Sequence, residues 1–340
     1  MAMQHDGQRE TTTWLQERFA TGALDYPVPA RSNSIDFMLG ALTLVSLTLL
    51  AISGSVLTLY YTPTPLAAHD SVRYMITGVP LISLLRSVHV WSASAALAFV
   101  FAHLIAVFWR RGFRRPREGL WWTGVLLLAL LFGLAFSGTV LRADQEAIEA
   151  LAHASIGAGM AGPLGAPLRG DFTPSSAVLT RLYGLHIAVL PLALFGLLGL
   201  HLWLIRHLGV SAPHDKVVPF RAHLRLLGGL ALILTALATI LALVLPADLL
   251  AAGVPGYEVT KPFWPFLWIY AAENLFGMSG MLVAPALLFG FLALVPVADR
   301  TDGRAARLTR AAGVLLFLLM LAAIAYAALA PAQPHIGMAM

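Results

Sequence analysis

Cysteine is missing from all 340 residues of this chain. Without a thiol, the polypeptide forms no disulfide, holds no cysteine-ligated iron–sulfur cluster and attaches no haem of the c type through a thioether. Charged residues are also scarce, at 11% of the sequence, whereas hydrophobic residues make up 59%. This composition lies far outside that of a soluble globular domain and predicts an integral membrane protein.

Long apolar runs account for most of the sequence. Crossing the hydrocarbon layer as an α-helix takes about 20 consecutive apolar residues. We therefore predict an all-α integral membrane protein with seven transmembrane helices, over 36–60, 84–109, 120–141, 182–206, 224–245, 277–297 and 309–331. The long connections 142–181 and 246–276 are expected to contain short surface helices, because connections of this length usually have a function.

Basic residues are spread unevenly over the connections between these spans. The connections after the second, fourth and sixth spans are rich in arginine, and the others carry few basic residues. By the positive-inside rule, the N-terminus is expected in the cytoplasm and the C-terminus outside, in a bacterial cytoplasmic membrane. The net charge of +5 then reflects topology, and no nucleic-acid partner is expected. We divide the chain into a cytoplasmic segment, 1–34, a four-helix half, 35–217, and a three-helix half, 218–340.

Four histidines lie deep inside two of these spans. His89 and His103 are fourteen residues apart in the second span, and His186 and His201 are fifteen apart in the fourth. In a regular α-helix these intervals advance the chain by about 21 to 22 Å and rotate it by roughly −40° and +60°, so each pair shares one helix face. Ionisable groups inside a bilayer are costly and tend to mark function. Two such helices facing each other predict two stacked imidazole pairs, each suited to bind a haem iron from both sides.

Glycines repeat nearly the same interval. Gly40 and Gly54 in the first span, and Gly124 and Gly138 in the third, are fourteen residues apart. Glycine lets a flat macrocycle approach the backbone closely. Small residues also serve ordinary helix packing in membranes, which is the alternative explanation for either pair alone. The shared period favours notches that contact the haems.

The other seven histidines lie in predicted loops, tails or helix ends. A single histidine in such a place is more often a hydrogen-bonded structural residue than a ligand. No ligand role is therefore expected for His5, His69, His153, His207, His214, His223 and His335.

Three segments resemble cytochrome b of the quinol-oxidising cytochrome bc complexes. They are 85–94 (LRSVHVWSAS), the basic turn 112–118 (GFRRPRE) and 181–191 (RLYGLHIAVLP). The resemblance covers nearly the whole chain. The fifteen-residue interval in the fourth span and the end after seven helices are similar to the photosynthetic type, in which the two halves are separate polypeptides, whereas here they are fused.

The resemblance implies two non-covalent b-type haems, the outer one held by His89 and His186 and the inner one by His103 and His201. It also implies that Arg86 pairs with a haem propionate, an arrangement favoured by the chemistry of arginine and carboxylates. Quinol is expected to be oxidised at the outer side and quinone reduced at the inner side. The implied partners are the quinone pool, a Rieske-type iron–sulfur protein and a cytochrome c or another high-potential acceptor, in a larger complex that contains a homodimer of this chain.

Several positions depart from the family pattern. Met38 stands where the photosynthetic relatives attach a further haem through cysteine. The outer quinol site is expected under Pro262 and Trp264, but Phe263 between them replaces the glutamate thought to accept a quinol proton. Oxidising a quinol releases protons, which a buried carboxylate of raised pKa is suited to accept. Glu273 is the candidate replacement, with a helix cap or a loop-fixing hydrogen bond as the structural alternative.

Two other functions stay open at this point. In the first, the chain is a di-haem membrane anchor that relays electrons between the quinone pool and a non-Rieske extracytoplasmic partner, without splitting the two electrons of quinol between two acceptors. The missing glutamate favours this alternative. In the second, the protein is a non-redox transporter or assembly subunit whose histidines line a polar path. Haem content separates the second alternative from the others.

Overall fold

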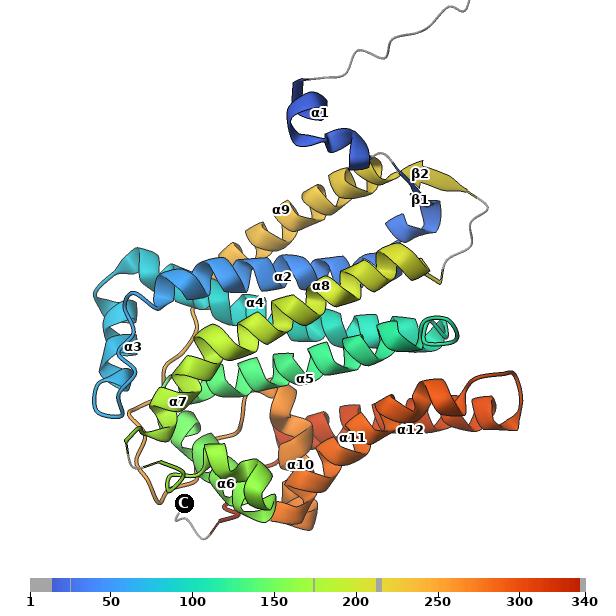
Figure 1. The fold of residues 1–340 in the computed structure, drawn as a ribbon. Coiled ribbons are helices and arrows are strands. Elements are labelled where there is room, and N and C mark those ends of the chain that lie inside the picture. Colours follow the sequence, from blue (N-terminus) through green and yellow to red (C-terminus); the bar gives the residue numbers. More distant parts are fainter. Residues whose placement is uncertain (1–13, 25, 174, 212–215, 337–340) are drawn as a thin grey trace, which may run out of the picture.

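The computed structural model describes residues 14–24, 26–173, 175–211 and 216–336 (Figure 1). His5 and His214, for which no role is expected, and residues 1–13 and 25 of the N-terminal segment 1–34 lie outside the described residues. Within the described ranges, seven helices are long and apolar enough to cross a membrane. They are α2 (Ile35–Leu57), α4 (Pro80–Trp109), α5 (Glu118–Val140), the continuous helix formed by α7 and α8 (Val178–Leu208), α9 (Phe220–Val244), α11 (Met278–Ala298) and α12 (Arg304–Leu329).

The predicted all-α membrane fold is confirmed, and each predicted span lies within five residues of the observed one at both ends. The two long connections contain the expected short helices, α6 (Gln145–Met160) and α10 (Leu267–Phe276). A further short helix, α3 (Ala68–Thr77), was not expected from the sequence. Gly277 separates α10 from α11 with φ +65°, a backbone conformation that glycine adopts without steric cost.

Short elements mark the two ends of the helix bundle (Figure 1). One end, called the α6 end here, carries α3, α6 and α10. The other end, called the sheet end, carries strands β1 (Pro27–Pro29) and β2 (Val217–Pro219), which pair antiparallel with Pro27 opposite Pro219. The helix α1 (Trp14–Phe19) and the short 3-10 helices η1 (Thr21–Leu24) and η2 (Ala30–Asn33) precede α2.

The three arginine-rich connections meet at the sheet end. Arg114, after α4, pairs with the fully buried Asp299, after α11, through Nε and Oδ1 at 3.0 Å. Arg117 donates through Nε to the carbonyl of Gly209, after α8, at 3.1 Å. These contacts fix the connections α4–α5, α8–α9 and α11–α12 against one another. The prediction that they share one side is therefore confirmed.

The centre of the bundle is an apolar core between α2, α4, α5 and α8. Leu47, Leu97, Leu127, Leu131 and Leu194 form it, all less than one tenth exposed. In lipid, such close packing stabilises the bundle through van der Waals contact. Helix α2 packs chiefly on α4, and α5 on α8. Helix α9 packs on α2 and α4, whereas α11 and α12 pack on each other and on α10, so the predicted division at residue 217 stays a prediction.

Candidate functional site

The four histidines of the sequence prediction face each other across the bundle in two pairs. His89 on α4 and His186 on the α7–α8 helix have ring centroids 6.5 Å apart, with the rings inclined at 60°. His103, fourteen residues further along α4, lies within electrostatic reach of His201 on α8. The fold thus brings together one imidazole from each helix at two levels of the bundle.

A local change of helix type absorbs the odd interval between His186 and His201. Residues Leu185–Val189 form a π-helical turn between α7 (Val178–Gly184) and α8 (Leu190–Leu208). A π-turn inserts one extra residue into an α-helix, and such turns often occur at functional sites. Because one of the fifteen residues from His186 to His201 is the inserted one, the two side chains are related as they would be by fourteen residues of a regular α-helix. The +60° rotation expected from a regular helix is therefore reduced, and both histidine helices present their pairs with the same period.

Hydroxyl groups define the tautomer of three of the histidines. Ser53 Oγ lies 3.0 Å from His89 Nδ1 and donates its own hydrogen to the Leu49 carbonyl at 2.6 Å. The oxygen is then left to accept from the ring, so Nδ1 carries the imidazole hydrogen. The lone pair of the neutral ring is consequently on Nε2. A hydrogen bond of this kind orients a metal-ligating histidine and raises its basicity.

The same arrangement occurs at two more histidines. Ser137 Oγ lies 2.9 Å from His186 Nδ1 and donates to the Gly133 carbonyl. Thr123 Oγ1 lies 2.8 Å from His201 Nδ1 and donates to the Leu120 carbonyl. His103 differs, because its Nδ1 is buried without a hydrogen-bond partner.

Each predicted glycine faces one of the histidine rings. A Cβ added to Gly54, Gly40 or Gly138 would lie 3.0 Å from Cε1 of His89, His103 or His186, respectively. At Gly124 the corresponding distance, to His201, is 3.5 Å. Any side chain at the first three positions would displace an imidazole. The space beside each imidazole ring therefore depends on glycine at these four positions.

Sequence reasoning missed the hydroxyl residues, although a signal for them was present. Ser53, Thr123 and Ser137 each immediately precede one of the four glycines, whereas Leu39 precedes Gly40. The repeated Ser/Thr-Gly pair is visible in the sequence. Its meaning depends on knowing which histidine the neighbouring helix places opposite.

Arg86, predicted to pair with a haem propionate, is buried at the α6 end of α4. Its Nη1 and Nη2 groups donate to the carbonyls of Ala247 and Asp248 at 2.6 and 2.7 Å. Arginine has five N–H donors, so three remain for another acceptor. The propionate role stays a prediction, and the observed contacts show that Arg86 also holds the connection after α9.

The predicted quinol segment sits against the histidine helices. Trp264, in the 3-10 helix η5 (Trp264–Phe266), approaches Ser94 of α4 with Nε1 and Oγ 3.3 Å apart. Phe263 and Trp264 also pack on the central apolar core. Pro262 immediately precedes them and is partly buried. The segment therefore contacts α4 five residues from His89 and nine from His103, so it lies nearer the first histidine pair than the second.

A carboxylate from another element reaches this segment. Glu146, on α6, accepts the Phe263 amide through Oε1 at 2.7 Å and pairs with Arg142 through Oε2. Burial raises the pKa of Glu146, although the positive charge of Arg142 opposes this shift. Glu146 thus contacts the backbone of the residue that replaces the family glutamate. It was not singled out from the sequence.

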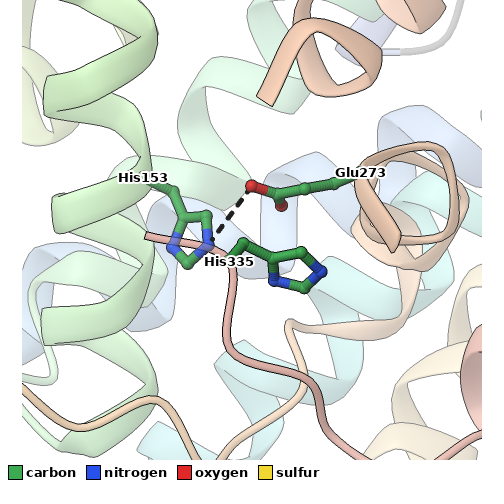
Figure 2. A group of neighbouring side chains, drawn as sticks. All are labelled: His153, Glu273 and His335. Carbon is green, nitrogen blue, oxygen red and sulfur yellow. Dashed lines mark ion pairs between the residues drawn. The ribbon is translucent and has the colours of Figure 1, made fainter. Parts of the chain in front are cut away.

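Glu273, the predicted proton acceptor, belongs to a separate cluster at the α6 end (Figure 2). Its Oε1 lies 3.4 Å from His153 Nε2 of α6, and His335 of the C-terminal tail is close to both. Glu258, which is fully buried, lies 3.0 Å from His153 Nε2 through Oε1. Burial raises the pKa of Glu273, while His153 and His335 oppose the shift and Glu258 adds to it.

Seven apolar helices among the described residues, with two facing pairs of histidines, define a membrane protein built around two pairs of buried imidazoles. Residues 23–209 match the sequence profile of the family Cytochrome b/b6/petB. The cytochrome b6 of Heliobacterium mobile is 35% identical over 210 residues, which span 59% of this chain and 99% of that protein. The cytochrome b6 of Prochlorococcus marinus strain MIT 9515 is 34% identical over 213 residues, spanning 59% of this chain and 95% of that protein.

A solved structure has the same fold over most of the chain. A chain of a hyperthermophilic respiratory Complex III superposes with a TM-score of 0.77 at 24% identity, and the match covers 94% of this chain and 91% of that one. The chain belongs to the cytochrome b/b6 family, the membrane-embedded cytochrome b subunits of bc-type quinol oxidoreductases.

Membership of this family implies haem binding, and the residues present fit the group. Three histidines have Nδ1 engaged by hydroxyls and Nε2 left as the ligand atom. His103 Nδ1 is an orphaned buried polar atom. Four glycines keep space beside the rings. The absence of cysteine excludes attachment of a haem through a thioether.

Proposed function

We propose that this chain carries two b-type haems and moves electrons across the membrane between an outer quinol-oxidising site and an inner quinone-reducing site. The observation that carries the proposal is the pairing of the four histidines at two levels, with the π-turn bringing the second helix into step with α4. His89 and His186 would hold one haem, and His103 and His201 the other. When bound, haem supplies one-electron redox chemistry, and two haems at these levels provide a path across the membrane.

The α6 end is the outer side in this proposal. Three arginine-rich connections lie at the sheet end, which the positive-inside rule places in the cytoplasm. His89 and His186 are then the outer pair. The N-terminus is cytoplasmic and the C-terminus outside, in a bacterial cytoplasmic membrane.

Labelling of single introduced cysteines tests this orientation without background, since the natural chain has no cysteine. Arg115→Cys and Arg304→Cys, both exposed at the sheet end, should react with a membrane-impermeant maleimide only in inverted vesicles. Ser175→Cys, exposed at the α6 end, should react in intact cells. The reverse pattern would exchange the outer and inner histidine pairs and both quinone sites.

The outer quinol site is assigned to the segment of Pro262 and Trp264, which packs on the helices that hold the outer histidine pair. Arg86 would orient the outer haem through its free N–H donors. We infer that Glu146 accepts a quinol proton, because it is buried, is bonded to the Phe263 backbone and has a raised pKa. Glu273, predicted from the sequence, remains the competing acceptor. A carboxylate of raised pKa is suited to this role at neutral pH.

The partners follow from the same assignment. A Rieske-type iron–sulfur protein takes the first electron of quinol and passes it to a cytochrome c or another high-potential acceptor. The complex contains a homodimer of this chain. The alternative is the di-haem relay to a non-Rieske partner. The replacement of the family glutamate by Phe263 favours this alternative. The contact of Glu146 with the Phe263 amide disfavours it, because it places another carboxylate at the quinol segment.

Haem content and quinol-driven reduction test the proposal on the purified complex. We expect two b haems per chain, extracted by acid acetone because no cysteine tethers them, and two steps in a redox titration. Quinol should reduce the outer haem when the inner site is blocked. One haem or none would refute the di-haem assignment. Failure of quinol to reduce the outer haem, with the inner haem in equilibrium with quinone, would establish the relay instead.

A further inference from the structure

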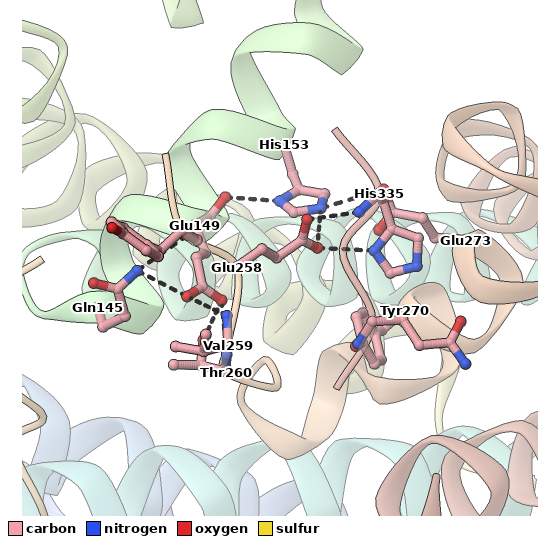
Figure 3. Close-up of polar contacts among 11 residues, drawn as sticks. Gln145, Glu149, His153, Glu258, Val259, Thr260, Tyr270, Glu273 and His335 are labelled. Carbon is pink, nitrogen blue, oxygen red and sulfur yellow. Dashed lines mark hydrogen bonds and ion pairs between the residues drawn. The ribbon is translucent and has the colours of Figure 1, made fainter. Parts of the chain in front are cut away.

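A buried group of histidines and glutamates at the α6 end lies apart from the four paired histidines. His153 of α6, Glu273 of α10 and His335 of the C-terminal tail each offer one ligand atom, and these atoms lie within 4.8 Å of one another. Glu258, in the connection after α9, adds a carboxylate oxygen 3.0 Å from His153 Nε2 (Figure 3). The four side chains come from four separate segments that the fold brings together.

The ring of His153 is oriented with Nε2 toward the two carboxylates. Its Nδ1 lies 2.8 Å from the Glu149 carbonyl, which only accepts, so Nδ1 carries the hydrogen. Nε2 faces Glu258 Oε1 at 3.0 Å and Glu273 Oε1 at 3.4 Å but has no hydrogen-bond partner of acceptable geometry. Direct hydrogen bonding therefore leaves the centre of the cluster unsatisfied.

Glu273 shows the same deficiency. Glu273 is 3% exposed, and its Oε1, aimed at His153, has no hydrogen-bond partner. His335 faces the cluster with Nδ1, which bonds Glu258 Oε1 at 2.8 Å, while its Nε2, on the side of the ring away from Glu258 and His153, is buried without a partner. Buried polar atoms without partners cost free energy. Two of them, His153 Nε2 and Glu273 Oε1, face each other in this cluster and point to a missing ligand.

Charge leads to the same conclusion. Glu258 and Glu273 are 1% and 3% exposed, so two carboxylates are buried close together. Among the described residues, the groups that act electrostatically on Glu273 are His153, His335 and Glu258, without a lysine or arginine. Buried charges are normally paired or bound to a metal. A divalent cation would neutralise both.

We propose that His153, Glu258, Glu273 and His335 bind a divalent metal ion of the Zn²⁺ class. Imidazole and carboxylate are ligands that zinc accepts in tetrahedral geometry, at about 2.0 to 2.2 Å, which places ligand atoms roughly 3.3 to 3.6 Å apart. The distances of 3.0 and 3.4 Å around His153 Nε2 are close to this spacing. Calcium and magnesium prefer all-oxygen sites and are disfavoured. The metal would tie the C-terminal tail to α6 and α10.

This site does not depend on the proposed electron transfer. A bound metal would prevent Glu273 from accepting a proton. Glu146 is not part of the metal site. Because the metal site includes neither Glu146 nor any of the four paired histidines, metal content and quinol-driven reduction can fail independently.

Zinc binding by the purified, detergent-solubilised complex tests the site. After treatment with EDTA and addition of ZnCl₂, the natural protein should retain about one zinc ion per chain on desalting, with N and O ligands at about 2.0 to 2.2 Å in X-ray absorption spectra. His153→Ala and His335→Ala should each weaken zinc affinity by at least about 10-fold. His335 follows the last helix, so we expect its replacement to leave the seven long helices folded, which circular dichroism of the variant checks.

His69→Ala is the matched control. His69 lies at the same end of the molecule, and its Nε2 bonds the Leu250 carbonyl at 3.0 Å, outside the cluster. Its replacement should leave zinc binding unchanged. The proposal is overturned if the natural protein retains no zinc after desalting, or if His153→Ala and His335→Ala retain as much as the His69 variant.

Discussion

Replacement of His103 or His201 by alanine should reduce the haem content of the purified protein from about two to one per chain, because each iron needs an imidazole from both sides. Replacement of His89 or His186 should remove the other haem instead. The pairing seen in the structure makes the two members of each pair equivalent in this assay. Pyridine haemochrome spectra and redox titration of each variant measure which haem is lost.

Ser53→Ala is the control that distinguishes loss of the ligand itself from loss of the hydrogen bond that orients its ring. It removes the hydroxyl that accepts from His89 Nδ1 but leaves the ligand atom in place. We expect both haems to be retained, with affinity for the outer one lowered by about 10- to 100-fold, as for other hydrogen-bond partners of metal ligands.

If His103→Ala and His201→Ala affected different haems, the proposed pairing would be wrong.

Glu146→Gln should slow quinol-driven reduction of the outer haem by about 10- to 1000-fold, the scale lost with many general bases. The variant keeps an oxygen for the Phe263 amide, so the loop is expected to stay in place. A carboxylate accepts a proton only when ionised. The natural rate should therefore fall as the pH drops through the raised pKa of Glu146, and this decrease should be absent in Glu146→Gln.

Glu273→Gln distinguishes the two candidate acceptors. It should leave the rate nearly unchanged if Glu146 takes the proton. A loss in Glu273→Gln alone, with haem content preserved, would assign the role to Glu273, as the sequence predicted. Stopped-flow reduction of both variants with the inner site blocked gives this comparison.

The length of the apolar runs made the seven spans predictable, and the helical period made the histidine pairs predictable. An apolar run of membrane-crossing length has few alternatives to a helix, because backbone groups in lipid must bond within their own segment. Intervals of fourteen and fifteen residues then place His89 with His103, and His186 with His201, on single helix faces. The arginine-rich connections likewise indicated which three share a side. These properties are local, so the sequence by itself determined them.

Contacts between segments far apart in the chain were decided only by the tertiary structure. The sequence contains Ser53 before Gly54, but only the packing of α2 on α4 places its hydroxyl against His89. The π-turn at Leu185–Val189 reduces the rotation between His186 and His201. A regular helical period does not predict this turn.

The acidic residues at the α6 end show the same limit. The sequence favoured Glu273, which lies near Phe263 and close to the start of the predicted span 277–297, yet Glu146, more than a hundred residues away, bonds Phe263. His153 and His335 looked like isolated loop and tail histidines. They meet Glu258 and Glu273 because α6, the connection after α9, α10 and the C-terminal tail converge there (Figure 3). Polar side chains in irregular segments carry no period, so only tertiary packing decides which of them become neighbours.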